Sequence, residues 1–290
     1  MPLHPIFKDK TFHIILISII VILSGTTTYL RLFFNPPDPI DQVFLANFGS
    51  FDKELSLQNI PEVVKPGSVQ VPILVYHSMW PHTPNQSPMQ KYYDVAPDAF
   101  VRQMQYLQDK GYVVISLDFL ASALDQNITL PPKSVVLTFD DGWRSQYTYA
   151  FPVLKKYGFT ATFFIYTNAI DHEYFLSWDQ VRLINNGGMT IGGHTKSHPY
   201  LPEIKDPAVL REEIIGGKRI IEDQIGQKIN LFAYPFGHYR DEVIAIVKQA
   251  GYTSARGTYK GIHHTKDDLY KLKAVEVTDD LTKFVNDLTY

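Results

Sequence analysis

Cysteine is absent from this chain of 290 residues. Its absence excludes disulfides, thiolate metal sites and cysteine nucleophiles, so any metal must be held by histidine and carboxylate side chains. The chain also lacks an excess of charge of either sign, because its formal net charge is −3. We therefore expect no nucleic acid partner.

Apolar residues dominate the segment from Phe12 to Phe34, which is long enough for a membrane span of about 20 residues. Lys8 and Lys10 precede this segment and favour a cytoplasmic N-terminus. We expect a short cytoplasmic segment at 1–11, a single-pass anchor at 12–34 and the rest of the chain outside the cytoplasmic membrane. The alternative is a cleaved signal peptide, which would make the protein secreted.

Six prolines between residues 35 and 72 predict a linker that ends near residue 70. From residue 71 to 290 apolar strand patterns alternate with helical ones, which predicts an α/β fold with a parallel sheet. A doubly wound sheet and a barrel both fit this alternation. Strands are expected at 71–77, 112–117, 135–139, 161–166, 189–193, 230–234, 252–255 and 274–277. Helices are expected at 97–110, 144–157, 178–185, 207–225 and 241–250.

The strand expected at 135–139 is followed by two adjacent carboxylates, Asp140 and Asp141, and by Gly142. An Asp-Gly turn is by itself ordinary. Because successive side chains of a strand point to opposite faces, we expect one carboxylate to bind a metal and the other to act as a base. His194 and His198 supply two imidazoles at close spacing, a ligand type that suits zinc.

The motifs T-F-D-D-G at 138–142 and H-T-K-S-H at 194–198 resemble those of the polysaccharide deacetylases of carbohydrate esterase family four, the NodB-homology family. That family includes deacetylases of chitin, peptidoglycan and biofilm poly-N-acetylglucosamine. The resemblance covers about residues 70 to 280 and is closest to the biofilm and cell-wall branch. It implies a distorted (β/α) barrel of about seven parallel strands, with the site at the carboxyl ends of the strands.

The resemblance implies that Asp141, His194 and His198 bind a divalent metal. Three protein ligands leave positions open for water and substrate, as a catalytic metal site requires. We expect zinc, and nitrogen and oxygen ligands also tolerate cobalt, nickel or manganese. Asp140 is then the expected general base, which takes a proton as water attacks an acetamide carbonyl.

The segment Ala233 to Gly237 resembles the family pattern R-x-P-[YF]-G, in which a backbone N–H stabilises the oxyanion. Here Pro235 and Phe236 match, with Phe236 as the donor, but Ala233 stands where the family has an arginine that orients the base. Another strand could supply that group, and Arg144 and Arg240 are candidates by proximity in the sequence. Trp178 is expected either to line a sugar cleft or to pack in the core.

The general acid has no clear motif, since the family's late L-x-H pattern is not matched. His264 and His263, expected in a loop, are candidates, with an exposed pair of loop histidines as the alternative. His77, at the end of the first strand, is another candidate, with a hydrogen-bonded buried histidine as the alternative.

The leading hypothesis is a membrane-tethered, metal-dependent N-deacetylase of an amino-sugar polymer such as poly-N-acetylglucosamine, peptidoglycan or a chitin-like chain. A second hypothesis is hydrolysis of another amide or ester, such as acetylxylan or a cyclic imide. A third is a non-catalytic surface protein that binds glycans. The expected partners are an N-acetylated polysaccharide and, through residues 12–34, the membrane.

Overall fold

A computed structural model describes residues 68–83 and 85–289 of the chain. The segment 1–11, the anchor expected at 12–34 and nearly all of the linker expected at 35–70 lie outside the described residues and stay predictions. No helix within the described residues is long and apolar enough to cross a bilayer. The described part opens with strand β1 (Val69–Gln70), close to the domain boundary expected at residue 71.

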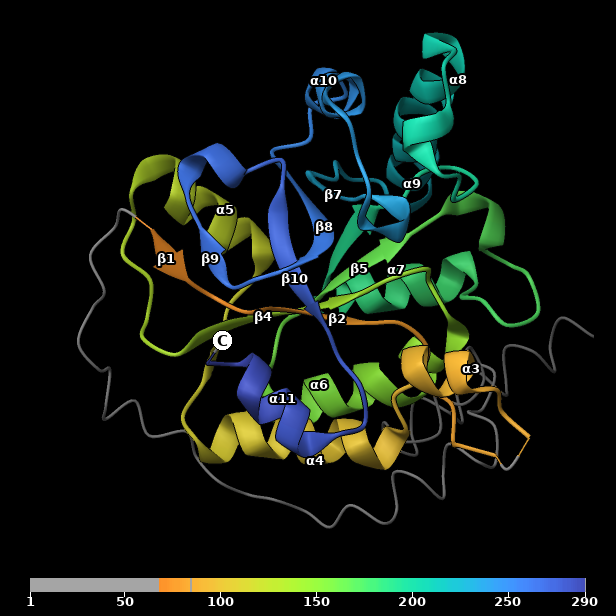
Figure 1. The fold of residues 1–290 in the computed structure, drawn as a ribbon. Coiled ribbons are helices and arrows are strands. Elements are labelled where there is room, and N and C mark those ends of the chain that lie inside the picture. The colour runs from red at the N-terminus through yellow and green to blue at the C-terminus, as the bar shows by residue number, and fades with distance from the viewer. Residues whose placement is uncertain (1–67, 84, 290) are drawn as a thin grey trace, which may run out of the picture. The chain divides into compact units, whose positions relative to one another are not determined.

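A closed barrel of parallel strands forms the centre of the fold (Figure 1). Pairing between β2 (Ile73–Tyr76) and β4 (Ser134–Phe139) closes the ring, and β3 (Val113–Val114) pairs with β4 from outside the ring. This confirms the expected seven-stranded barrel and excludes the doubly wound sheet. In order around the ring the strands are β2 (Ile73–Tyr76), β10 (Leu272–Glu276), β8 (Ser254–Lys260), β7 (Leu231–Ala233), β6 (Thr190–Gly193), β5 (Thr162–Ile165) and β4 (Ser134–Phe139), with β3 (Val113–Val114) beside β4.

Helices connect the strands and cover the outside of the barrel (Figure 1). The helix expected at 207–225 is continuous but contains a π-helical segment, and so does the one expected at 144–157. The helices are α3 (Pro88–Tyr93), α4 (Pro97–Asp109), α5 (Leu117–Gln126), η2 (Gln146–Ala150), α6 (Phe151–Tyr157), η3 (Thr167–Ala169), α7 (Trp178–Asn186), η4 (Leu201–Glu203), α8 (Pro207–Arg211), η5 (Glu212–Gly216), α9 (Gly217–Ile225), η6 (Pro235–Gly237), α10 (Asp241–Gln249), η7 (Lys266–Asp268) and α11 (Leu281–Asp287). Gly111, Gly158 and Gly251 adopt the left-handed conformation expected at the helix-to-strand junctions.

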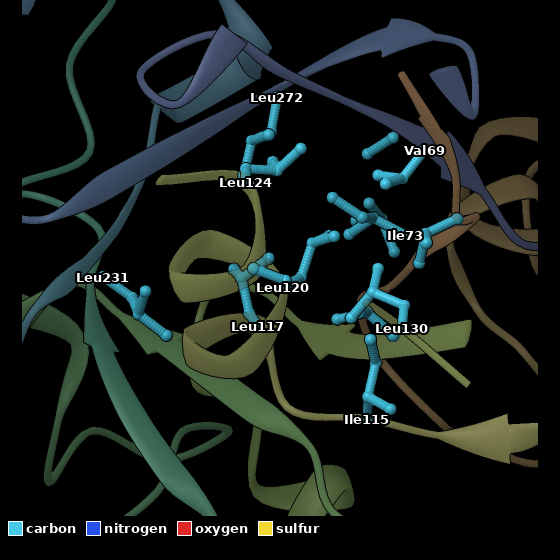
Figure 2. Packing of buried hydrophobic residues seen from close by; sticks show 14 of the residues in the cluster. Val69, Ile73, Ile115, Leu117, Leu120, Leu124, Leu130, Leu231 and Leu272 are labelled. Carbon is cyan, nitrogen blue, oxygen red and sulfur yellow. The ribbon is translucent and has the colours of Figure 1, made fainter. Parts of the chain in front are cut away.

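Helix α5 was not expected, and it closes the N-terminal end of the barrel. The strand predicted at 112–117 is wrong in its second half, because Ser116 caps a helix that begins at Leu117. Figure 2 shows Leu117, Leu120 and Leu124 of this helix packed with residues at the starts of the barrel strands. The apolar cluster fills this end of the barrel with side chains, so a polar site can lie only at the carboxyl end.

Candidate functional site

The two adjacent carboxylates diverge at the carboxyl end of β4. The strand ends at Phe139, and Asp141 has a left-handed backbone with φ of 71°. The prediction that strand alternation separates the two side chains is therefore wrong in its cause, because the turn after the strand separates them. Asp140 is 2% exposed, and its amide donates to the carbonyl of Tyr76 at the end of β2.

Asp141, His194 and His198 meet at this end of the barrel. Their ligand atoms all lie within 4.8 Å of one another. Asp141 Oδ1 lies 3.6 Å from His194 Nε2 and 3.4 Å from His198 Nε2. Each group offers one donor atom toward a common point, which fits a divalent metal with open positions.

Further contacts orient these donor atoms. His194 donates through Nδ1 to the carbonyl of Ala233 at 2.7 Å, which leaves Nε2 directed at Asp141. Trp143 donates through Nε1 to Asp141 Oδ2 at 3.0 Å. In this arrangement Asp141 Oδ1 faces the two imidazoles, where a metal could bind, and the other oxygen has a protein partner.

The electrostatics of Asp141 and His198 agree with use as metal ligands, whereas those of His194 do not: burial lowers the pKa of His194, but the hydrogen bond to Asp141 and the charges of Asp140 and Asp141 outweigh it and raise the pKa. Burial raises the pKa of Asp141, but the hydrogen bond from His194 and the charges of His77, His194 and His198 outweigh it and hold the pKa well below its usual range. Burial, together with the charge of His194, lowers the pKa of His198 to about 4. An ionised carboxylate and a neutral imidazole are the forms that bind a metal.

Arg256 of β8 supplies the guanidinium that the family pattern has at the position of Ala233. Its Nη2 pairs with Asp140 Oδ1, and the arginine side chain is completely buried. Ala233 and Arg256 are register partners on the adjacent strands β7 and β8. The arginine therefore lies one strand away from the position that it has in the family pattern. Arg144 and Arg240 were the wrong candidates, because they bind the carbonyls of Glu173 and Ile204 instead.

His77 lies at the end of β2, where its Nδ1 is 3.5 Å from a carboxylate oxygen of Glu276 at the end of β10. Gln146 ties this side of the site together, because its amide donates to the carbonyls of both His77 and Asp140. Burial raises the pKa of Glu276, and the nearby His77 opposes this shift. Neither Glu276 nor Gln146 was predicted, since neither belongs to a motif.

The structure does not bring His264 to the site. His264 and His263 form strand β9, which pairs with β1, so the expected loop is wrong. His264 Nε2 donates to the carbonyl of Val71, which lies before the start of β2 and therefore at the opposite end of the barrel from Asp140. Burial lowers the pKa of this imidazole to about 4, as expected for a neutral structural histidine.

Pro235 and Phe236 occupy the short turn η6, directly after β7. The ring of Phe236 lies 4.7 Å from the ring of His198, so this segment reaches the metal ligands as expected. Trp178 is partly exposed at the first turn of α7. The stacked pair beside Asp141 is instead Trp143 and Phe175, with ring centroids 4.5 Å apart.

Comparisons with known proteins agree with this geometry. Residues 127–255 match the family model described as polysaccharide deacetylase. The Bacillus subtilis protein YxkH, named as a polysaccharide deacetylase, is 29% identical over 213 residues, which are 73% of each protein. A deacetylase of Streptococcus pyogenes, PplD, solved with acetate, superposes with a TM-score of 0.69 at 29% identity and covers 77% of this chain and 99% of its own. The chain therefore contains a segment that is similar to the polysaccharide deacetylase family.

These similar proteins support the expected enzyme class, a hydrolase that acts as a polysaccharide N-deacetylase. A poly-β-1,6-N-acetyl-D-glucosamine N-deacetylase of Escherichia coli K12 is 30% identical over 137 residues. That match covers 42% of this chain but only 20% of the Escherichia coli protein, so the likeness is to one part of a longer enzyme. Both family motifs, at 138–142 and 194–198, lie inside the segment that the family model matches.

Proposed function

We propose that this protein removes N-acetyl groups from an amino-sugar polymer by metal-dependent hydrolysis. The observation that carries the proposal is the cluster of Asp141, His194 and His198 beside a second, buried carboxylate, Asp140, that an arginine holds in place. A ligand set with an adjacent base is the arrangement that hydrolysis of an amide by water requires.

A divalent metal held by these three ligands, with zinc as our first choice, would polarise the acetamide carbonyl and acidify the attacking water. Asp140 takes the proton from that water as its oxygen bonds to the carbonyl carbon. Because Arg256 occupies Oδ1 of Asp140, we assign Oδ2 as the proton acceptor. The backbone N–H of Phe236 is the proposed donor to the oxyanion.

His77 is the proposed general acid. Glu276 faces its Nδ1, which leaves Nε2 to deliver a proton to the amide nitrogen as the carbon–nitrogen bond breaks. The products are acetate and a free amine. The non-catalytic hypothesis draws its support from the missing family arginine and the unmatched acid motif, and we propose Arg256 and His77 for these two roles.

Acetate release tests the proposed function directly. The purified chain is incubated with N-acetylglucosamine oligomers, peptidoglycan and acetylxylan, with and without a chelator. We expect acetate and an equal amount of free amine from an amino-sugar substrate, loss of both with chelator, and recovery when zinc is returned. Acetate without amine would favour the esterase alternative, and no acetate from any substrate would refute the proposal.

Substitution of the two carboxylates separates their roles. Asp140→Asn should retain full metal content and lose about 10²–10⁴ in rate, because an amide cannot accept the proton. Asp141→Asn should lose metal and recover part of its rate when metal is added in excess. Metal analysis and metal-titrated rates of both variants give the comparison, and the opposite pattern would exchange the two assignments.

A further inference from the structure

The proposed base and the proposed acid follow two paired strands at the same level. Strands β2 and β4 pair in parallel, and their last register partners are Tyr76 and Phe139. His77 and Asp140 are the next residues of the two segments, and the amide of Asp140 donates to the carbonyl of Tyr76 at 2.8 Å. The pairing ends there, where Asp141 adopts a left-handed backbone. The carbonyls of His77 and Asp140 therefore need donors from outside the two strands.

The side chain of Gln146 supplies both donors. Its carboxamide nitrogen, Nε2, donates to the carbonyl of His77 at 3.0 Å and also to the carbonyl of Asp140. Only the NH₂ group of a carboxamide can donate two hydrogen bonds, so the two carbonyls fix the orientation of the amide. One planar group thus connects the backbone of the proposed acid to the backbone of the proposed base.

The residue before Gln146 strengthens this connection. Ser145 accepts a hydrogen bond through Oγ from the backbone nitrogen of Met79 at 2.9 Å. Both Ser145 and Gln146 are completely buried, and Gln146 opens the π-helical segment η2. Two successive side chains therefore hold the turn that follows β2, one at the carbonyl of His77 and the other at the amide of Met79.

The other end of the Gln146 amide sets this residue apart. Its Oε1 is buried and has no hydrogen-bond partner among the described residues. A buried acceptor without a partner destabilises the fold, so the two hydrogen bonds of Nε2 must offset that loss. Gln103, which is equally buried, uses both ends of its amide, because it accepts from the hydroxyl of Tyr76 at 3.0 Å and donates to the carbonyl of Thr278 at 2.8 Å.

We propose that Gln146 is a positioning residue that sets the separation of the proposed base and the proposed acid. The roles of Asp140 and His77 rest on the proposed function. Both side chains exchange a proton with the same acetamide and its attacking water, so both must face it from fixed positions. Because Gln146 binds backbone atoms of the two residues, it acts through them and not on the substrate.

Kinetics of Gln146→Met test this proposal, since methionine keeps the length of the side chain and removes both donors. We expect kcat for acetate release to fall about 10- to 100-fold, because a shift of about 1 Å in a catalytic group has an effect of this size. KM should change less than about threefold, and metal affinity should equal that of the native chain. An unchanged kcat would overturn the proposal.

The same substitution in an Asp140→Asn background isolates the part that acts through the base. The loss of kcat caused by Gln146→Met should be smaller there than in the native chain, since a base that cannot accept a proton gains nothing from its position. Equal losses in the two backgrounds would overturn the assignment of Gln146 to Asp140.

Gln103→Met is the matched control, because it removes two hydrogen bonds from an equally buried glutamine and neither bond involves the backbone of Asp140 or His77. It should lower stability and leave kcat at the native value. Gln146→Glu is the second variant, since it keeps the shape of the side chain and donates to one carbonyl at most. It should also lower kcat, and a native kcat in this variant would overturn the proposal.

Crystal structures of the native chain and of Gln146→Met give a measure that needs no activity. We expect the carbonyl oxygens of His77 and Asp140 to lie farther apart in the variant. An unchanged separation would overturn the proposal even if kcat falls. Absence of acetate release by the native chain would refute the proposed function, and the separation would still decide whether Gln146 positions these two residues.

Discussion

At the scale of single residues, the buried pair of Arg256 and Asp140 is the contact on which the proposed base depends. Both side chains are almost fully removed from water. A charge left alone in such a place is strongly destabilising, typically by about 3–5 kcal/mol, because the lost partner is not replaced by solvent. We expect Arg256→Met to lower the free energy of unfolding by about this amount and to reduce the rate as well, as urea unfolding and acetate release would measure.

The matching control is the double variant Arg256→Met with Asp140→Asn. Removing both charges should recover much of the lost stability, whereas the rate should stay at the level of Asp140→Asn alone. Additive losses of stability in the double variant would show that the two side chains do not interact in the folded protein.

The buried His264 makes the free energy of unfolding depend on pH, and it does so away from the functional site. Burial lowers its pKa from 6.5 to about 4, so the unfolded chain takes up a proton at a higher pH than the folded chain. Stability is therefore fully present above pH 6.5 and is lost as the pH falls towards 4, by up to roughly 3 kcal/mol.

Urea unfolding at pH 7.5 and pH 4.5 measures this difference for the native chain and for His264→Gln. The native chain should lose more stability than the variant on acidification, because glutamine can donate to Val71 and does not titrate in this range. Equal losses in both proteins would contradict the assignment of His264 as a buried neutral group.

At the scale of elements, segment η5 holds the loop that carries His198, the third proposed metal ligand. Glu213 in η5 accepts hydrogen bonds from the backbone nitrogens of Lys196 and Ser197, at 3.1 and 2.8 Å. A Cβ on Gly217 would lie 2.8 Å from the carbonyl carbon of Thr195, so only glycine lets the helix approach so closely. These contacts stabilise the loop in which His198 has a left-handed backbone, with φ of 59°.

We expect Glu213→Ala to weaken metal affinity about 10- to 100-fold, as removal of a group that orients a ligand typically does. Glu212→Ala is the matched control, because Glu212 precedes Glu213 and bonds to the side chain of Lys196, whereas Glu213 bonds to the backbone of the loop. A metal titration with a competing chelator gives both affinities. Equal affinities in the two variants would remove Glu213 from the positioning of His198.

At the scale of the whole molecule, location is the main proposal that rests on the sequence alone. We propose that residues 12–34 anchor the chain and that the barrel lies outside the cytoplasmic membrane, where a polysaccharide substrate would be. Protease added to intact, wall-stripped cells should release a soluble fragment that begins between residues 36 and 70. Complete protection of the barrel would place it inside and would make such a substrate implausible.

The sequence alone determined the alternation of strands and helices, the parallel sheet and the residues at the ends of β4 and β6. These features are local, because a buried strand, a glycine at a helix end and a motif such as H-T-K-S-H at 194–198 are each visible within a few residues. The family resemblance added the barrel. Within a segment the local signal failed mainly at 112–117, where a serine cap converted the expected end of a strand into helix α5.

Only the tertiary structure decided which distant residues complete the site. Arg256 reaches Asp140 because β8 pairs with β7, so that it lies beside Ala233. Glu276 reaches His77 because β10, the last strand in the chain, pairs with the first strand of the barrel. His264 is far from the site because β9 pairs with β1 at the other end. Closure of the barrel decides which strands are neighbours, and the spacing of these residues in the sequence does not reveal that pairing.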